Sequence, residues 1–414
     1  NIYYKMGGGL MQLVAMGAQD VFLTGNPQIT FFKVVYRRHT NFSKECIIQD
    51  FSGSGTFGSS LTCTLSRNGD LVQEIYLNTT VTARATGGAT TKANIKLTDL
   101  TNLIKTVEVE IGGQKIDKHY AAWLDIYNEL FETNIDYAKN MVGNKESGAA
   151  TADGATVTVA QEIFVPLRFW FNRNPGLALP LIALQYHEVK VKVELAAVAD
   201  VKNSVAVALD TATSTDLVAT TNLAAAGAAA PAANNADIAM TSPQLLVNYV
   251  YLDTDERRRF AQVSHEYLIE QVQHTGTDTG AAITLTYNHP VKALFWSGAN
   301  GTTRKLQLNG HDRFTEQTSK YFKLVQPYES GLGRNGETMS ATRTWSTVTT
   351  GSATEMYSFA LKPGEHQPSG TCNFSRIDNA RLNLTGNDQS VNVFALNYNV
   401  LRVMSGMGGL TYSN

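Results

Sequence analysis

The feature that most constrains the fold of this chain is an internal repeat of short β-type segments. The matched pairs are Glu45–Gln49 with Glu266–Glu270, Leu61–Leu65 with Ile283–Tyr287, Val109–Gly113 with Leu306–Gly310, Pro175–Pro180 with Pro363–Pro368, and Val247–Tyr249 with Leu396–Tyr398. Each match alone is weak, because short alternating patterns recur by chance. Their common order, with residue-number offsets that fall from 221 for the first pair to 149 for the last, indicates two homologous domains in tandem.

The segments themselves are those of a β protein. Val107–Ile111, Val189–Leu195 and Ile283–Tyr287 alternate apolar and polar side chains, which is the pattern of strands with one buried face. Gly, Asn and Pro separate such segments at short intervals, as in sandwiches and barrels. One helix is predicted, because apolar residues recur at helical spacing from Tyr120 to Phe131. The sequence therefore predicts an all-β fold with short helical decorations.

The first copy is longer than the second mainly because of an Ala-rich stretch near its end. Residues 187–248 contain no aromatic side chain, and residues 217–236 are mostly Ala, Asn and Thr. Small side chains gain little by burial, so residues 201–244 are predicted to form a long surface insertion loop. The alternative, an Ala-rich helix, is disfavoured by Gly227 and Pro231 within the stretch.

The repeat and the insertion together predict the domain organisation. The connection between the two copies falls where Asp255–Arg259 forms a short polar stretch. The predicted parts are an N-terminal arm over residues 1–25, a first domain over 26–253 that includes the insertion loop at 201–244, a linker over 254–263 and a second domain over 264–414.

Charge is sparse and balanced along the chain. The 34 Lys and Arg residues and the 36 Asp and Glu residues give a net charge of −2, and charged residues make up only 17% of the 414 positions. This balance argues against a protein whose task is to neutralise nucleic-acid phosphates. A surface with few charges fits a protein that meets neighbours over much of its area, and it fits an extracellular β protein equally well.

Cysteine usage and the beginning of the chain bear on the compartment. Three cysteines, Cys46, Cys63 and Cys372, show no C-x-x-C spacing and cannot form a disulfide framework, which indicates a reducing compartment or simple use in the core. No apolar run reaches the length of a membrane span, and the first residues do not read as a signal peptide. The natural start is predicted to be Asn1 of a trimmed chain or Met6.

Signals of an enzyme are nearly absent. The eight histidines never stand as H-x-H, H-x-x-x-H or H-E-x-x-H, so cupin and zincin metal sites find no support. The adjacent pairs His187–Glu188 and His265–Glu266 would point to opposite faces of a strand, so a structural role is expected for them. No nucleophile elbow, Walker loop or G-x-G-x-x-G occurs. We therefore predict no catalytic, cofactor-binding or metal-binding residues and no cofactor.

Two basic clusters and a set of glycosylation sequons have plain structural explanations. Asp255 and Glu256 offset the charge of Arg257–Arg259, which predicts a solvated turn. Arg37 and Arg38 follow an apolar run and are expected to make hydrogen bonds or ion pairs at a strand end or a subunit contact. The N-x-[ST] sequons lie at Asn41, Asn78, Asn300, Asn373 and Asn383. Without a signal peptide, chance in an Asn- and Thr-rich chain explains them.

Several long blocks of the sequence carry a specific resemblance. They are Gly17–Phe42 (GAQDVFLTGNPQITFFKVVYRRHTNF), Ser66–Leu71, Glu110–Tyr120, Pro175–Lys190, Leu252–Arg257, His265–Gln271, Gln367–Asn379 and Asn397–Gly409. Together they resemble the major capsid proteins of nucleocytoplasmic large DNA viruses, especially those that infect algae. The resemblance covers nearly the whole chain and departs only before Met6 and in the variable loops.

The resemblance implies a fold and an assembly. Members of that family fold as two consecutive eight-stranded jelly rolls, and three chains form a homotrimeric capsomer with a pseudo-hexameric outline that tiles an icosahedral shell. It also implies that the insertion at 201–244 faces outward. The arm, with Leu10, Met11, Leu13 and Val14, would lie on the inner side, against minor capsid proteins and above an inner membrane that it does not span.

The function expected from the repeat, the sparse charge and the resemblance is that of a major capsid protein in the virion of a large double-stranded DNA virus. Its expected partners are copies of itself, minor capsid and penton proteins and, through outer loops, host-surface glycans, with no sequence-specific nucleic-acid binding and with assembly in the host cytoplasm. The alternative is a tandem β-sandwich carbohydrate-binding or cupin-like protein, which the absent histidine cluster disfavours.

Overall fold

The computed structural model of the chain describes residues 8–86, 91–97, 100–132, 140–143, 145–146, 155–201, 205–211, 237–332 and 354–412. The chain divides into two compact units, Asn1–Asn41 and Phe42–Asn414. In the first unit, α1 (Gly8–Val14) and α2 (Val21–Thr24) bury none of their side chains. We predicted an arm over residues 1–25. No strand is found between residue 26 and the first strand at Phe42, so the strand end expected at Arg37 and Arg38 is not present.

The first half of the second unit contains two antiparallel sheets. Their main strands are β1 (Phe42–Asp50), β2 (Ser60–Thr64), β3 (Leu71–Thr86), β5 (Ile104–Ile111), β6 (Gln114–Tyr120), β8 (Thr156–Pro166), β10 (Val189–Leu195) and β13 (Gln244–Leu252). The β13 sheet has the order β1-β13-β3-β8, and the β10 sheet has the order β2-β10-β5-β6. Two shorter strands, β9 (Leu179–Pro180) and β12 (Asp237–Met240), add to the β13 sheet by pairing with β3. Three others, β4 (Thr91–Leu97), β7 (Lys145–Glu146) and β11 (Val205–Thr211), form a separate small sheet in the order β11-β4-β7. We call residues 42–252 barrel 1.

The second half repeats this arrangement strand for strand. Its main strands are β14 (His265–Asp278), β15 (Ala282–Thr284), β16 (Pro290–Ser297), β17 (Thr303–Leu308), β18 (His311–Asp312), β20 (Glu355–Ser358), β22 (Ala380–Thr385) and β23 (Val391–Met404). The β23 sheet has the order β14-β23-β16-β20, and the β22 sheet has the order β15-β22-β17-β18. The minor strands are β19 (Gln317–Thr318), β21 (Cys372–Asn373) and β24 (Met407–Leu410). We call residues 265–410 barrel 2.

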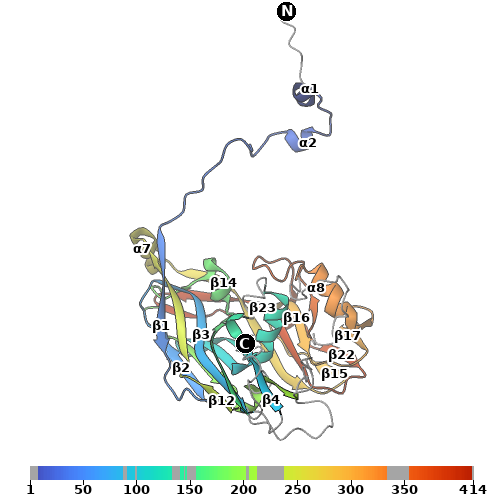
Figure 1. Cartoon of the computed structure of the whole chain (residues 1–414). Coiled ribbons are helices and arrows are strands. Elements are labelled where there is room, and N and C mark those ends of the chain that lie inside the picture. Colours follow the sequence, from blue (N-terminus) through green and yellow to red (C-terminus); the bar gives the residue numbers. More distant parts are fainter. Residues whose placement is uncertain are drawn as a thin grey trace, which may run out of the picture. The chain divides into compact units, whose positions relative to one another are not determined.

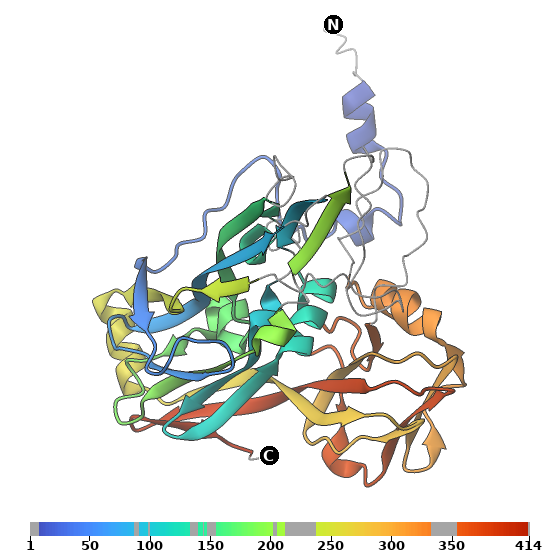
Figure 2. The ribbon, with the colours of Figure 1, turned by 60° about the horizontal axis from the view of Figure 1, so that its bottom comes forward.

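The strand order confirms the predicted double jelly roll. In each barrel, the eight main strands are divided four and four between two sheets, and the chain passes back and forth between these sheets, as in a jelly roll. The two barrels lie side by side within the second unit (Figures 1 and 2). The domain limits that we drew at 253 and 264 stay predictions. Between them the chain forms α7 (Thr254–Gln262), a helix rather than the expected turn, whose first N–H is accepted by the Asp253 carboxylate at 2.8 Å.

The alternating segments form the sheets for the expected reason. In β10 every second residue, from Val189 to Leu195, is buried, and the Lys and Glu residues between them are only partly buried. On that outer face Lys192 pairs with Glu110 of the neighbouring β5. The burial of one apolar face of each sheet produces the core of barrel 1, which includes Leu61, Cys63 and Val247.

The helices are few and short. They are α3 (Ala121–Leu130), α5 (Trp170–Arg173), α6 (Val198–Val201) and α8 (Gln326–Glu329), with single turns η1 (Thr101–Leu103), η2 (Pro175–Leu177), η4 (Tyr321–Val325) and η5 (Phe374–Arg376). The predicted helix at 120–131 is confirmed as α3. It is not a decoration, because Trp123, Ile126 and Leu130 are buried against residues of barrel 2.

The structure corrects one match of the internal repeat. Leu61 and its partner Ile283 both point into a barrel core, as the sequence match requires. Val247 also points into a core, but its matched partner Leu396 lies on the opposite face of the β23 sheet, under α3. Because side chains alternate along a strand, that match is displaced by an odd number of residues. The strands correspond, but the residues paired in that match do not.

The predicted insertion is only partly loop. Its ends contain β11, which pairs with β4, and β12, which pairs with β3 between Asp237 and Met240. β12 extends the β13 sheet, and β11 belongs to the separate β11-β4-β7 sheet, so part of the stretch contributes to the fold. Residues 212–236, which hold the Ala-rich segment, lie outside the described residues.

Candidate functional site

The region in which the two barrels meet, which we call the seam, contains a buried charge cluster and a group of aromatic contacts. From barrel 1, α3 places Trp123 against the outer face of the β23 sheet. The Trp123 ring centroid lies 5.5 Å from that of Phe295 and 5.8 Å from that of Phe394. All three side chains are buried. Aromatic pairs at such distances add to the free energy gained from burying their area, so the seam is a core and not a loose contact.

Consecutive residues of β14 bind barrel 1 on the same side of the seam. The Gln271 side-chain amide donates to the Ile116 carbonyl, and the Val272 N–H donates to Asp117 Oδ1 at 3.1 Å. Ile116 and Asp117 belong to β6, the edge strand of the β10 sheet. Without this contact the edge of the β10 sheet would be open. The two hydrogen bonds provide partners for polar groups of that edge.

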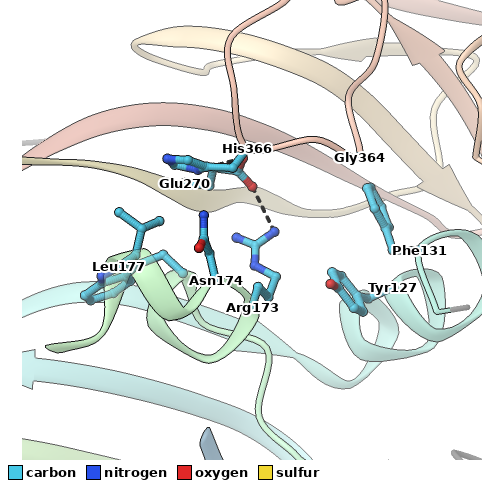
Figure 3. A pocket seen from close by; sticks show the side chains of 9 residues that line it. Tyr127, Phe131, Arg173, Asn174, Leu177, Glu270, Gly364 and His366 are labelled. Carbon is cyan, nitrogen blue, oxygen red and sulfur yellow. Dashed lines mark ion pairs between the residues drawn. The ribbon is translucent and has the colours of Figure 1, made fainter. Parts of the chain in front are cut away.

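The preceding residue of β14, Glu270, lines a cavity of about 260 Å³. Figure 3 shows its lining: Tyr127, Phe131, Trp170, Arg173, Asn174, Leu177, Glu270, Gly364 and His366. Residues 127–177 come from barrel 1 and the others from barrel 2. The cavity therefore lies in the seam itself, and its lining combines aromatic rings with the charged side chains of Arg173 and Glu270.

Glu270 is the centre of a buried charge cluster. Arg173 Nη1 lies 2.8 Å from Glu270 Oε2, and Lys292 Nζ lies 2.6 Å from Glu270 Oε1. His366 Nδ1 is 3.7 Å from the same carboxylate. Lys292 also donates to the carbonyl of Glu365 at 2.9 Å. Two cations from different barrels thus share one carboxylate, which fixes the barrels to each other.

The environment of Glu270 and Lys292 shifts the pKa values of both groups. Burial alone would raise the pKa of Glu270, but the charge of Arg173, the hydrogen bond from His366 and the charge of Lys292 together lower it to about 2. Burial lowers the pKa of Lys292, although Glu270 opposes the shift. The carboxylate therefore remains ionised at neutral pH and holds a permanent negative charge inside the seam.

The C-terminal hairpin closes the seam from the other end. Leu401 and Val403 of β23 belong to the core of barrel 1. The Gly408 carbonyl lies 3.0 Å from His187 Nδ1, and the Tyr186 N–H donates to the Gly406 carbonyl at 3.0 Å. Barrel 1 is therefore completed by residues from the far end of the chain.

The charged residues of the seam are arranged to hold the two barrels together. The Glu270 carboxylate is already neutralised by two cations, and the residues that line its cavity include no Ser, Thr or Cys that could act as a nucleophile. Within the described residues, no group of three or more His, Cys, Asp or Glu side chains is placed to hold a metal ion. The expectation of no catalytic, cofactor or metal residues stays a prediction.

A second buried ion pair lies inside barrel 2, away from the seam. Arg304 Nε and Nη2 donate to the two oxygens of Glu355 at 2.7 and 2.9 Å. The Trp296 indole N–H and the Ser319 hydroxyl also donate to this carboxylate. Every oxygen of the buried acid therefore has partners, which is the condition for a buried charge to be tolerated.

The residues that the sequence singled out are dispersed. His187 and His265 each contact a backbone carbonyl, and Arg257 pairs with Asp70 at 2.9 Å. The sequon residues Asn41, Asn300 and Asn373 are exposed, whereas Asn78 and Asn383 are partly buried. In the first unit Leu10, Met11, Leu13 and Val14 are exposed. None of these groups forms a common site in the described part of the chain.

The sequence analysis did not predict the charge cluster, although one residue of the cluster indicates a buried ion pair. Lys292 stands alone within the apolar run from Val291 to Trp296, and an isolated charge in a buried strand requires a partner. Glu270 offers no comparable signal, because it stands beside other polar residues of the same strand, such as Gln271 and Gln273. Among the helices of the described residues, none is long and apolar enough to cross a membrane.

Comparisons with known proteins give a consistent result. The family model described as major capsid protein N-terminus matches residues 30–253, and the model described as large eukaryotic DNA virus major capsid protein matches residues 256–305 and 297–409. The chain is 54% identical to the major capsid protein of Pyramimonas orientalis virus, with 99% of this chain and 100% of the relative covered. It is 40% identical to the major capsid protein of Paramecium bursaria Chlorella virus 1, with the same coverage.

Solved structures agree with these sequence relatives. The PBCV-1 virus capsid, a quasi-atomic model, superimposes with a TM-score of 0.68 at 35% identity, covering 93% of this chain and 100% of that chain. The Faustovirus major capsid protein superimposes with a TM-score of 0.66 at 12% identity, covering 94% of each chain. The second likeness shows a shared fold alone.

Proposed function

The chain belongs to the major capsid proteins of large eukaryotic DNA viruses, and from this membership we propose that three copies associate into a pseudo-hexameric capsomer. It is a component of the virion capsid. The observation that carries the proposal is the repeated strand order, because two barrels of one topology in each chain give six similar barrels in a trimer. A ring of six similar units can be surrounded by six neighbours and so can tile a shell.

The seam supports this proposal. Each subunit of a capsomer has to present its two barrels in one fixed orientation, since every lattice contact depends on that orientation. Trp123 of barrel 1, packed on the outer face of the β23 sheet of barrel 2, and the Glu270 cluster shared by both barrels provide that rigidity. Each contact between subunits can then be weak, because the shell gains its stability from many contacts at once.

The finer parts of the assignment remain predictions. Minor capsid and penton proteins, a nearby inner membrane, host glycans at the outer loops, the absence of any catalytic step, and assembly in the host cytoplasm are not tested by the structure. The structural role of the relatives supports a protein without catalysis. The alternative of a cupin-like or carbohydrate-binding protein would require stoichiometric metal or a glycan ligand, which a metal assay and a glycan array measure.

Light scattering coupled to size-exclusion chromatography tests the trimer. One chain has a mass of 45.1 kDa, so the native protein should elute with a mass of about 135 kDa, three times that of the chain. A native protein that remains at 45 kDa at all concentrations contradicts the proposal. Electron micrographs of the same sample should show particles with a six-sided outline.

A further inference from the structure

The cavity in the seam has an apolar side that barrel 1 provides. The rings of Tyr127 and Phe131 stack on each other, with their centroids 5.0 Å apart and their planes inclined by 12°. Trp170 and Leu177 also line the cavity, and both are buried. Flat apolar walls favour a flat apolar group over water, because covering them removes apolar area from solvent. This part of the lining therefore suits an aromatic ring.

Arg173 brings a positive charge into the same cavity. Figure 3 shows its side chain extending from barrel 1 toward Glu270, and its Nη1 lies 2.8 Å from Glu270 Oε2. The guanidinium carries several N–H donors, and its buried Nε has no hydrogen-bond partner among the described residues. Its central carbon lies 5.8 Å from the centroid of the Tyr127 ring. An anion attached to an aromatic ring would therefore find a charged donor and an aromatic wall side by side.

The charges in contact with Glu270 leave an excess of positive charge. Arg173 and Lys292 both pair with this one carboxylate. Burial lowers the pKa of Lys292 although Glu270 opposes the shift, so a single carboxylate does not fully compensate the buried cation. Neighbouring ionisable side chains pair with one another: Arg168 with Glu132, Lys362 with Glu365, and Asp117 with His119. A buried positive excess is stabilised by a further anion.

The volume of the cavity limits the ligand. It is about 260 Å³. A water molecule takes up about 30 Å³ in the liquid, so about nine non-hydrogen atoms fit, which is the size of a benzene ring with one carboxylate. A bare inorganic anion would leave the rings uncovered, and a neutral aromatic molecule would leave N–H groups of Arg173 unpaired. We propose that the cavity binds a small aromatic carboxylate, whose anion pairs with Arg173 and whose ring lies against Tyr127 and Phe131.

Such a ligand would join the two barrels. Tyr127, Phe131 and Arg173 belong to barrel 1, whereas Glu270 and His366 belong to barrel 2, and all of them line the cavity. A molecule that binds only when these surfaces are together stabilises the folded chain, to an extent set by its concentration and affinity. The site lies within a single chain, so it goes beyond the proposed capsomer, and its test does not depend on whether three copies associate.

Calorimetric titration of the native protein tests the site. The probe is benzoate, compared with benzyl alcohol, which keeps the ring without the charge, and with inorganic phosphate, which keeps a charge without the ring. Benzoate should bind at one site per chain and at least about tenfold more tightly than either comparison compound, since one charge-assisted hydrogen bond is worth about that factor. The absence of saturable benzoate binding overturns the inference, as does equal binding of benzyl alcohol or phosphate.

Two substitutions should weaken benzoate binding for different reasons. Arg173→Lys keeps a counter-charge for Glu270 but loses the planar fork, and it should weaken binding about tenfold. Leu177→Trp fills the cavity without altering a charge and should abolish binding. Leu23→Trp, at a side chain that is 86% exposed in the first unit, is the matched control and should leave the affinity unchanged. A Leu177→Trp protein that is folded by its far-ultraviolet spectrum and still binds benzoate as the unmodified chain does overturns the inference.

Photolabelling of the unmodified chain locates the bound compound even where a variant fails to fold. The para-azido derivative of benzoate has the same ring and carboxylate, and irradiation attaches it to nearby residues. Peptides that contain Tyr127, Phe131, Arg173 or His366 should carry the label, and excess benzoate should suppress it. Label confined to other peptides, or label that excess benzoate does not suppress, overturns the inference.

Discussion

Trp123 of barrel 1 lies edge-on to Phe295 of barrel 2, with their ring centroids 5.5 Å apart and their planes inclined by 69°. The two residues belong to different halves of the repeat, and yet both are fully buried. The seam between the barrels is therefore packed as a domain interior is packed. This relationship explains why residues 42–414 form one compact unit.

Removal of this contact should weaken the seam strongly. Trp123→Ala should lower the free energy of unfolding by about 3–5 kcal/mol, because it leaves a cavity against Phe295 and Phe394. Urea unfolding followed by circular dichroism measures the change. Tyr412→Ala, at an exposed side chain, is the control and should change stability by less than about 0.5 kcal/mol. A loss equal to that of the control would show that the two barrels are not coupled through α3.

The buried carboxylate of the seam should be more costly to neutralise than an exposed one on the same strand. Glu270→Gln leaves Arg173 and Lys292 without their counter-charge and should cost about 3–5 kcal/mol. Glu266→Gln, on the same strand and at an exposed pair with Arg402, should cost less than about 1 kcal/mol. Chemical denaturation of both variants at pH 7 makes the comparison. Equal effects would contradict a locking role for Glu270.

The same carboxylate predicts an acid-sensitive seam. The pKa of Glu270 is about 2 in the folded chain and 4.5 ordinarily, so the unfolded state binds the proton first as the pH falls. Its stabilisation, about 3 kcal/mol, is therefore complete above pH 4.5 and is lost progressively down to pH 2. Unfolding free energies measured between pH 6 and 2.5 should fall more steeply for the unmodified chain than for Glu270→Gln. Parallel curves would contradict the prediction.

The buried pair of barrel 2 should require the shape of arginine as well as its charge. Arg304→Lys keeps the positive charge but loses the fork that binds both oxygens of Glu355. We expect a loss of about 2 kcal/mol or more. Arg402→Lys at the partly exposed pair with Glu266 is the matched control, with an expected change below about 0.5 kcal/mol. Thermal unfolding of the two variants, measured side by side, distinguishes them.

The C-terminal hairpin should depend on the absence of a side chain at Gly408. A Cβ atom there would lie 2.6 Å from Leu184 Cδ2 and 3.3 Å from Ile111 Cγ2. Gly408→Ala should therefore loosen the hairpin, at a cost of about 1–3 kcal/mol, and should speed amide hydrogen exchange in β24. At the neighbouring Gly409 a Cβ would meet only the end of the Gln114 side chain, at 3.1 Å. Gly409→Ala should consequently have a smaller effect.

Much of the fold was predictable from the sequence, and the exceptions have one physical cause. Alternating patterns located β2, β5 and β10 because each has one buried and one solvated face. β23 is buried on both faces over most of its length, since α3 covers its outer side. A strand of this kind loses its alternation, and the pattern no longer fixes which residues face the core. For this reason the repeat paired Val247 with Leu396, although the two side chains lie on opposite faces of their sheets.

The seam was the least predictable part of the molecule. Lys292 in its apolar run predicts a buried acidic partner. The sequence does not reveal that this partner, Glu270, also pairs with Arg173 from the other half of the chain. Contacts between the barrels depend on their relative orientation, which no local pattern encodes. The helix at 120–131 was correctly predicted, while its role became visible only when the sheet that it covers was in place.

The presence of Leu401 and Val403 in the core of barrel 1 has a consequence for the order of events during synthesis. Nascent barrel 1 lacks these side chains until residues 401–403 have left the ribosome, long after its own last strand has emerged. Barrel 1 therefore cannot reach its final stability during translation. The first barrel is thus completed only together with the second, although its own strands are synthesised earlier.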